Sequence, residues 1–477
     1  MHTPDDIIHK ATKAIESLIS IADAYDGLIP SIIDRTTQRM MTELPPAIPG
    51  QRDGDRSHLG SNLIHDEVLL LTMNSLAETE GRSDFSEAVH RYFERFAAHC
   101  TNTPTGIFPW GEHAYWHLVN DAVGNSYLLR DRPGDPPVTH DHLRQAPLWL
   151  WEKIHNVRPE CVVRFGEGLD GHWSEGEPTD IVEEYIRHAY IEDPSPYKRG
   201  SRSCDFPRHG GFYIFDWAFA FAKSGRTEFA DRIRRMLGYW WPKRDDLDLL
   251  LIESRSPEED ENFYQVNAPG QTLSLGVSLL EAGPLVRELD GGLADDMETM
   301  GRAYIDAFFR APHDIASGIF ALLSKRGSNE IRQTMPIWGS VYGVWPASYV
   351  ALTCLCGYTL TEDSRLLEWA EAVGEGSCST PFPEESAIPA MDAGLGLGLL
   401  ADLYDLTTDR KWLTGGLELA DRLLDVYCDQ VIPRGAAGIH WYESQMGPGF
   451  LIHGLTRIAL MARDGLPCPL NADYTAR

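Results

Sequence analysis

The chain has 477 residues, of which 43% are hydrophobic and 10% aromatic, which is enough for a large buried core. Acidic residues outnumber basic ones by 71 to 42 and give a formal net charge of −29, which argues against nucleic-acid binding because that needs basic faces. No apolar run approaches the ~20 residues that span a membrane. No signal-like leader precedes the first helical pattern, and the eight cysteines are scattered, so we expect a soluble cytoplasmic protein without disulfides.

The sequence predicts helices from its beginning. Residues 7–24 carry apolar side chains at a three-to-four spacing, and a stretch dense in breakers and charge follows at 45–56. A local pattern then recurs: an apolar helix ends in a short polar turn, and a large apolar residue opens a second, amphipathic helix. The turns lie at 79–85, 223–229, 361–367 and 407–412, with a looser case between predicted helices at 273–282 and 293–309. Ser or Thr in these turns can cap the second helix.

Repeated helix pairs indicate a stacked, all-α architecture. Their spacing is too irregular for a solenoid, and long variable loops suit a closed (α/α) toroid of about six or seven hairpins with its long loops at one end. We expect a single domain over residues 1–477, with Phe85, Phe229, Leu366 and Trp412 buried at equivalent points. Strand-like alternation is scarce, and residues 247–253 are the best short candidate.

Residues 100–211 contain no repeat turn and form the expected long loop region that carries the site. Nine of the seventeen histidines lie between His99 and His209. Function concentrates on long loops held by rigid scaffolds, and neutral imidazole and carboxylate are ligands for divalent ions such as Mn²⁺ or Zn²⁺. Two alternatives stay open: His113 could be hydrogen-bonded under a loop, and Asp141 could cap a helix over 143–153.

The stretch 205–211 places Arg208 and His209 before an aromatic run at 212–222, which is typical of a helix buried nearly all round. Pro207 suits the first turn of such a helix. We therefore expect Arg208 and His209 to lie at the mouth of the scaffold and to face inward. The alternative is a loop arginine paired with a carboxylate beside a hydrogen-bonded histidine.

Three segments resemble, in the same order, landmarks of family 2 of the polysaccharide lyases: Pro-Trp-Gly-Glu-His at 109–113, His-Asp-His at 140–142 and Pro-Arg-His-Gly at 207–210. These are (α/α)-barrel pectate lyases, some of them cytoplasmic. The resemblance implies that His113 and His209 bind a metal such as Mn²⁺ and that Arg208 is the base. The middle segment departs from the family pattern, because Asp141 stands where the family has a metal-binding glutamate and His142 is a rival ligand.

The implied reaction is β-elimination in a uronate-containing oligosaccharide, with the metal stabilising the enolate. An arginine is almost always protonated, so Arg208 could instead clamp the carboxylate while Tyr115, Tyr185 or His188 takes the proton. The remaining expected substrate contacts belong largely to aromatic- and amide-rich segments of the kind that form sugar subsites: Trp110, Arg144, Asn267, Gln271 and Trp338.

Two other functions compete with the lyase. One is an inverting glycoside hydrolase using two carboxylates such as Asp66 and Glu443, or a sugar epimerase on the same scaffold with histidines as acid and base. The other is a binding toroid without chemistry, which the histidine-rich loops disfavour. The fold class alone cannot choose between them, and the sequence leaves homo-oligomer formation open.

Overall fold

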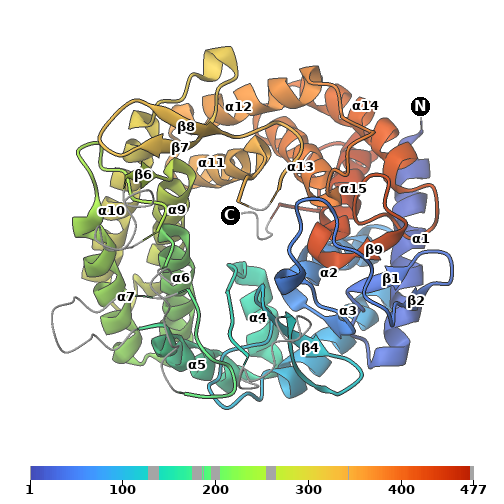
Figure 1. The fold of residues 1–477 in the computed structure, drawn as a ribbon, viewed down its shortest axis with the longest axis horizontal. Coiled ribbons are helices and arrows are strands. Elements are labelled where there is room, and N and C mark those ends of the chain that lie inside the picture. The colour runs from blue at the N-terminus through green and yellow to red at the C-terminus, as the bar shows by residue number, and fades with distance from the viewer. Residues whose placement is uncertain are drawn as a thin grey trace.

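The structure is a computed structural model that describes residues 2–126, 139–173, 185, 187–194, 205–253, 265–341 and 343–472. Its helices form a closed ring when viewed end-on (Figure 1). They are α1 (Pro4–Ala22), α2 (Leu63–Thr79), α3 (Ser83–Arg95), α4 (Leu148–Val157), α5 (Pro159–Gly168), α6 (Pro207–Ser224), α7 (Thr227–Trp240), α9 (Pro269–Val286), α10 (Gly291–Arg310), α11 (Ala347–Thr361), α12 (Ser364–Ser379), α13 (Ala390–Thr407), α14 (Arg410–Tyr427) and α15 (Pro448–Asp464).

Consecutive helices pair around this ring, and the predicted all-α toroid is confirmed. Helix α2 packs on α3, α6 on α7, α9 on α10, α11 on α12 and α13 on α14, while α4 and α5 fill the sector between α3 and α6. The last helix, α15, packs between α13 and α2 and against α1. The two ends of the chain therefore close the ring together.

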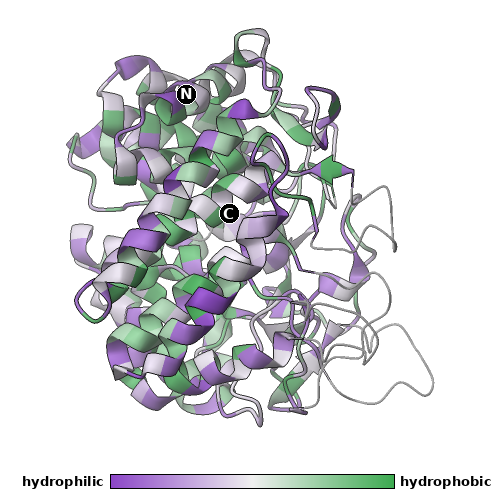
Figure 2. Ribbon diagram, turned by 90° about the vertical axis from the view of Figure 1, so that its left-hand side faces the viewer, coloured by the Kyte–Doolittle hydropathy of each residue, from purple (hydrophilic) through white to green (hydrophobic). Residues whose placement is uncertain are grey.

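The inner and outer helices differ in their patterns of burial. Nearly every residue of α6 and of α15 is buried, as expected for a helix surrounded by protein. Outer helices such as α7 and α14 bury one face, and Figure 2 shows hydrophilic and hydrophobic residues interleaved along single helices. Most buried hydrophobic residues, from Ile7 to Leu470, belong to one connected cluster, and Leu249, Ala307 and Ala311 form a small second one.

The recurring turn has a common geometry. The predicted apolar residue is the third residue of its outer helix in every case, and each is at most 1% exposed: Phe85, Phe229, Leu366 and Trp412. Four positions earlier each turn has a residue with positive φ: Gly81, Gly225, Glu362 and Thr408. A left-handed residue is a common way to end a helix. The expected burial at equivalent points is confirmed.

Short strands lie in the loops that connect the helices. They make three antiparallel sheets in the orders β2-β1-β9, β3-β4-β5 and β6-β7-β8. Their bounds are β1 (Ile32–Asp34), β2 (Arg39–Met40), β3 (Gly60–Ser61), β4 (Ala114–His117), β5 (Ala122–Asn125), β6 (Val266–Asn267), β7 (Ala321–Lys325), β8 (Ile331–Thr334) and β9 (Trp441–Glu443). Pairing of Ile33 with Tyr442 joins an early segment to a late one.

One local prediction is largely wrong, and one alternative does not hold. Residues 247–253 form no named strand, because Leu247 and Leu249 turn around the Asp245 carboxylate, which accepts their backbone N–H groups; only the end of the stretch pairs with β6, through a bridge between Leu251 and Asn267. The alternative of a helix over 143–153 capped by Asp141 does not hold, because the helix begins at Leu148, after Pro147. Among the described helices, none is both long and apolar enough to cross a membrane.

Candidate active site

Two adjoining cavities open at one end of the ring and share Glu112, Trp345 and Tyr349. Their walls include residues from the first turns of six inner helices: His65 of α2, Arg208 of α6, Gln271 of α9, Tyr349 of α11, Met391 of α13 and Phe450 of α15. These helices therefore all begin at the cavities. A helix N-terminus carries a partial positive charge, so the arrangement favours an anionic ligand.

Arginines add to this positive charge in a chain that is acidic as a whole. Arg52 and Arg144 line the first cavity, and Arg208 lines the second. The carboxylates of Asp55, Glu112 and Glu253, which line the cavities, each have an arginine partner. Arg52 donates to both oxygens of Asp55, at 2.9 and 2.7 Å, Arg144 donates to Glu112, and Arg187 lies 3.3 Å from Glu253.

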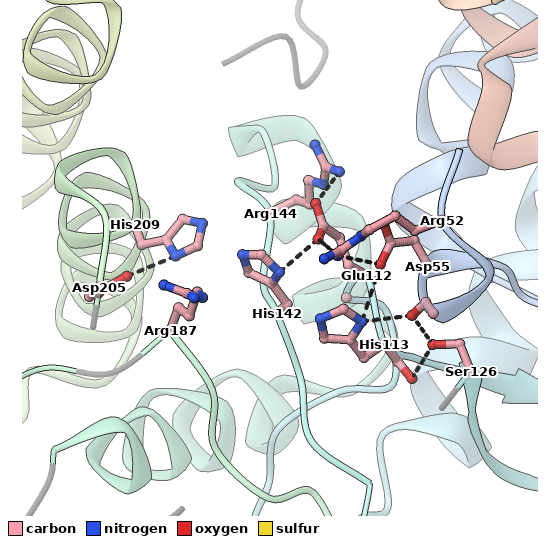
Figure 3. A network of polar contacts seen from close by, with 12 residues as sticks. Arg52, Asp55, Glu112, His113, Ser126, His142, Arg144, Arg187, Asp205 and His209 are labelled. Carbon is pink, nitrogen blue, oxygen red and sulfur yellow. Dashed lines mark hydrogen bonds and ion pairs between the residues drawn. The ribbon is translucent and has the colours of Figure 1, made fainter. Parts of the chain in front are cut away.

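Five histidines form a cluster beside the second cavity, and we call them the histidine cluster: His113, His140, His142, His188 and His209. The ring centres are 4.5 Å apart for His140 and His188, 4.9 Å for His113 and His140, and 5.3 Å for both His113–His142 and His113–His188. His142 lies 4.9 Å from His209. His113 and His209 thus each lie beside His142 (Figure 3), and their binding of one common metal stays a prediction.

Hydrogen bonds fix the orientation of two of these rings. Nδ1 of His113 donates to the carbonyl oxygen of Gly54 at 2.7 Å, and Nδ1 of His209 donates to Oδ1 of Asp205 at 2.8 Å. In both rings Nε2 therefore carries the lone pair, and this is the atom that binds a metal or accepts a proton in a neutral imidazole. Nδ1 of His142 lies 2.7 Å from Oε2 of Glu112 (Figure 3).

Burial controls the charge of the cluster. It lowers the pKa of His140 to about 4 and holds the pKa of His113, His188 and His209 well below the usual value, with neighbouring imidazoles adding to the effect. Burial alone would raise the pKa of Glu112, but His142 and Arg144 outweigh it and hold that pKa well below its usual range. His113, His140, His188 and His209 are therefore neutral imidazoles beside an ionised carboxylate.

Two overlapping groups in the described residues could hold a metal ion. One is His113, His140 and His188, and the other is Glu112, His113 and His142; within each group the potential ligand atoms lie within 4.8 Å of one another. Neutral imidazole and carboxylate suit a divalent transition metal, so the donor set fits the metal that the sequence predicted. His209 belongs to neither group.

The structure does not bring Asp141 to the cluster. Its carboxylate accepts a hydrogen bond from the backbone N–H of Ala189 at 2.7 Å and lies 2.8 Å from Nε2 of His172. The side chain is fully buried and caps no helix, since α4 begins at Leu148. Asp141 therefore joins the segment that carries His140 and His142 to the one that carries His188.

The other predicted residues divide between cavity walls and core. Arg144 and Gln271 line the cavities, whereas Trp110 packs against Phe96, Phe108, Trp151 and Phe165. The remaining aromatic and amide candidates are engaged elsewhere: Tyr185 with the carbonyl of Leu169, Asn267 with Asp245, Trp338 with the carbonyl of Thr380, and Tyr115 against Gly60 and Gly124.

The two carboxylates considered for a hydrolase lie outside the walls of both cavities. Asp66 is fully buried and accepts a hydrogen bond from the hydroxyl of Tyr92 at 2.8 Å. Glu443 accepts two hydrogen bonds from Arg56, at 2.7 and 2.9 Å. Both side chains are thus held in the interior by internal partners.

Sequence reasoning missed several residues of the site. Glu112 lies in the motif at 109–113, which assigns it no role, and Arg52 and Asp55 lie in the stretch 45–56, whose density of breakers and charge is the only signal for them. His140 was noted only as part of a motif, although it contacts both His113 and His188. Of the histidine-rich loop, Glu183, Glu184 and Ile186 lie outside the described residues.

Comparison with known proteins gives similarity of fold only. No known protein family and no curated sequence matches the chain. The solved structures that it resembles include a sugar epimerase from a ruminal bacterium (12% identity, 81% of this chain and 89% of that one, TM-score 0.47). Another is the cellobiose 2-epimerase of Bacillus thermoamylovorans (9% identity, 95% of this chain and 98% of that one, TM-score 0.44). A third is an unsaturated glucuronyl hydrolase specific for heparin (10% identity, 96% of this chain and 98% of that one, TM-score 0.44). Resemblance this distant carries no functional argument.

Proposed function

We propose that the protein is a carbohydrate-active enzyme whose reaction begins by removing a proton next to a carbonyl or carboxylate group of an acidic sugar. The observation that carries this proposal is the position of His142. Its ring lies in the wall of the second cavity, its Nδ1 is 2.7 Å from Glu112, and Arg208 lines the same cavity. A histidine held by a carboxylate is a common general base.

The arginines suit a carboxylate on the substrate. Arg208 lies between the rings of Phe206 and Trp345, at 5.4 and 5.7 Å from their centres, and Arg187 lies 4.9 Å from the centre of Phe206. Stacked guanidinium groups keep their planar forks oriented for bidentate binding. Together with the inner-helix N-termini they would bind a uronate carboxylate and stabilise the negative charge that develops as the proton leaves.

His113, with His140 and His188, would hold a divalent metal, because the overlapping group of His113, Glu112 and His142 would use the proposed base as a ligand. When bound, such an ion supplies Lewis-acid stabilisation of an enolate. The residues of the chain do the rest: Arg208 orients the carboxylate, His142 takes the proton, and the aromatic walls at Trp345 and Tyr349 offer flat surfaces to a sugar ring.

Two outcomes share this first step. Expulsion of the leaving oxygen on the neighbouring carbon gives β-elimination, the reaction that the lyase-like motifs imply. Delivery of a proton to the opposite face of the carbanion gives epimerisation instead, and this second candidate needs an acid besides His142; His209, whose ring centre lies 4.9 Å from that of His142, is the nearby imidazole for that role.

The test is incubation with a panel of uronate-containing oligosaccharides in D₂O, with and without chelator. Elimination creates a conjugated double bond that absorbs in the ultraviolet. Epimerisation gives no such absorbance but incorporates deuterium from solvent. New reducing ends with neither signal would identify a hydrolase and contradict the proposal, and so would the absence of any change in the panel.

A further inference from the structure

Three histidines of the cluster form a group that the lyase resemblance does not predict. His113, His140 and His188 have potential ligand nitrogens within 4.8 Å of one another. In a tetrahedral site with metal–nitrogen bonds of ~2.0–2.1 Å, neighbouring ligand atoms are about 3.3 Å apart. Small rotations of three side chains would therefore bring these nitrogens to ligand geometry, without movement of the backbone.

The backbone around this group is already fixed. His140 and Tyr190 form an antiparallel bridge, the N–H of Asp141 donates to the carbonyl of Ala189 at 3.0 Å, and the N–H of Ile191 donates to the carbonyl of Thr139 at 2.8 Å. These two hydrogen bonds make up the bridge, and the Asp141 carboxylate adds a third bond by accepting from the N–H of Ala189. These bonds hold the two segments that carry His140 and His188 side by side.

The third histidine comes from a different part of the fold. His113 immediately precedes β4, and its Nδ1 donates to the carbonyl oxygen of Gly54. This bond leaves Nε2 as the ligand atom, which is how ligand histidines are usually oriented by a group outside the metal's own shell. Three rigid segments thus each supply one imidazole.

We propose that His113, His140 and His188 form a three-histidine transition-metal site, which leaves Glu112 and His142 as a separate pair for proton transfer. A set of three imidazoles without a carboxylate suits Zn²⁺ or Co²⁺ better than Mg²⁺, Ca²⁺ or Mn²⁺, which prefer oxygen. Three protein ligands also leave a coordination position open for substrate or water. The assignment does not depend on the reaction proposed above.

The test measures metal binding without any substrate. Metal-free protein is titrated with Co²⁺ and followed by visible absorption, and binding of Zn²⁺ is measured by competition. We expect about one ion per chain, an absorption band typical of nitrogen ligation, and no displacement by a large excess of Mg²⁺. Loss of a hydrogen-bond partner of a ligand lowers metal affinity by ~10–100-fold. Loss of a ligand itself should cost more, so His140→Gln and His188→Gln should each lower the affinity for Co²⁺ by at least about 100-fold.

Matched variants separate the two overlapping groups. His142→Gln and Glu112→Gln should leave Co²⁺ affinity within about threefold of the wild type, and so should His90→Asn, which removes an exposed histidine. His113 belongs to both groups and is not diagnostic. His140 is only partly buried, so its variant tests the site even if His188→Gln fails to fold.

Loss of the metal in His142→Gln or Glu112→Gln with retention in His140→Gln would place the ion in the other group and overturn the proposal. Absence of Co²⁺ and Zn²⁺ binding by the wild type would overturn it as well. Neither result bears on whether the protein turns over uronates, so failure of the metal site and failure of the proposed reaction remain distinguishable.

Discussion

The guanidinium carbon of Arg208 lies 5.7 Å from the centre of the Trp345 ring, on the wall of the cavity that also contains His142. Arg208→Lys keeps the positive charge but loses the planar fork. We expect kcat to fall by ~10²-fold or more, as when one preorganised transition-state donor is removed. The melting temperature and the bound metal should change little, because the candidate ligands are other residues.

Turnover and unfolding of Arg208→Lys are measured on the same preparation, with Arg302→Lys as a control on an exposed arginine of α10. A purely structural arginine would give the opposite pattern: a lower melting temperature, with activity that follows the folded fraction. Near-normal turnover per folded molecule would remove Arg208 from the mechanism.

The ring could be predicted from the sequence because its repeating unit is local. Each turn is followed by a large apolar residue that must pack back on a preceding helix, as Leu366 does against Gly357 of α11. Such a contact depends on residues close in the chain. The sequence left open whether Asp141 caps a helix, because its bond to Ala189, 48 residues away, cannot be seen in the local pattern.

The site was predicted only in part, for the same physical reason. Motif order brought His113, His142, Arg208 and His209 to attention, and the structure places these four around one end of the ring. Nothing in the spacing shows that the segment of His140 pairs with that of His188. Aromatic residues suit a sugar subsite and a core equally well, so the burial of Trp110 could not be inferred either.

The single domain proposed for residues 1–477 predicts one cooperative unfolding event. The buried hydrophobic cluster is continuous from Ile7 to Leu470, and α1 packs on α15 at the point where the ring closes. We therefore expect the near- and far-ultraviolet circular dichroism transitions in urea to coincide. Two separated transitions, or a stable proteolytic half, would contradict this organisation.

The left-handed turn residues predict opposite effects of two substitutions. Thr408 is exposed and has φ of 57°, an unfavourable conformation for a β-branched residue, so Thr408→Gly should stabilise the protein by ~1 kcal/mol. Gly225 has φ of 68°, and an added Cβ there would meet no atom within 4 Å. Gly225→Ala should therefore destabilise by ~1 kcal/mol through the backbone alone. Urea unfolding measures the free energy of unfolding of both variants. Changes of the same sign in the two would refute the explanation.

Leu366 tests the packing of the hairpins. It is fully buried, and its Cδ1 closely approaches α11 at Gly357. Leu366→Ala should lower the free energy of unfolding by ~3 kcal/mol, since it removes buried methyl groups and leaves a cavity. Glu368→Ala on the exposed face of the same helix should change it by no more than ~0.5 kcal/mol. A similar loss in both variants would show that the helix, not the contact, is responsible.

Asp66 predicts how stability depends on pH. Burial raises the pKa of this carboxyl to about 8 in the folded protein, against a lowering contribution from the hydroxyl of Tyr92, whereas the unfolded chain should ionise near ~3.9. Between these two values the folded state binds the extra proton. Raising the pH through this window therefore favours unfolding, and the loss is complete once the pH exceeds about 8.

Asp66→Asn isolates this contribution, because the amide imitates the protonated carboxyl at every pH. The difference in melting temperature, variant minus wild type, should be smallest near pH 4, rise steadily as the pH increases, and level off above about pH 8. Other ionisable groups contribute equally to both proteins and cancel in the difference. A difference that stays constant from pH 4 to pH 9 would mean that the carboxyl ionises alike in both states, and that Asp66 is not the neutral acid inferred from its burial.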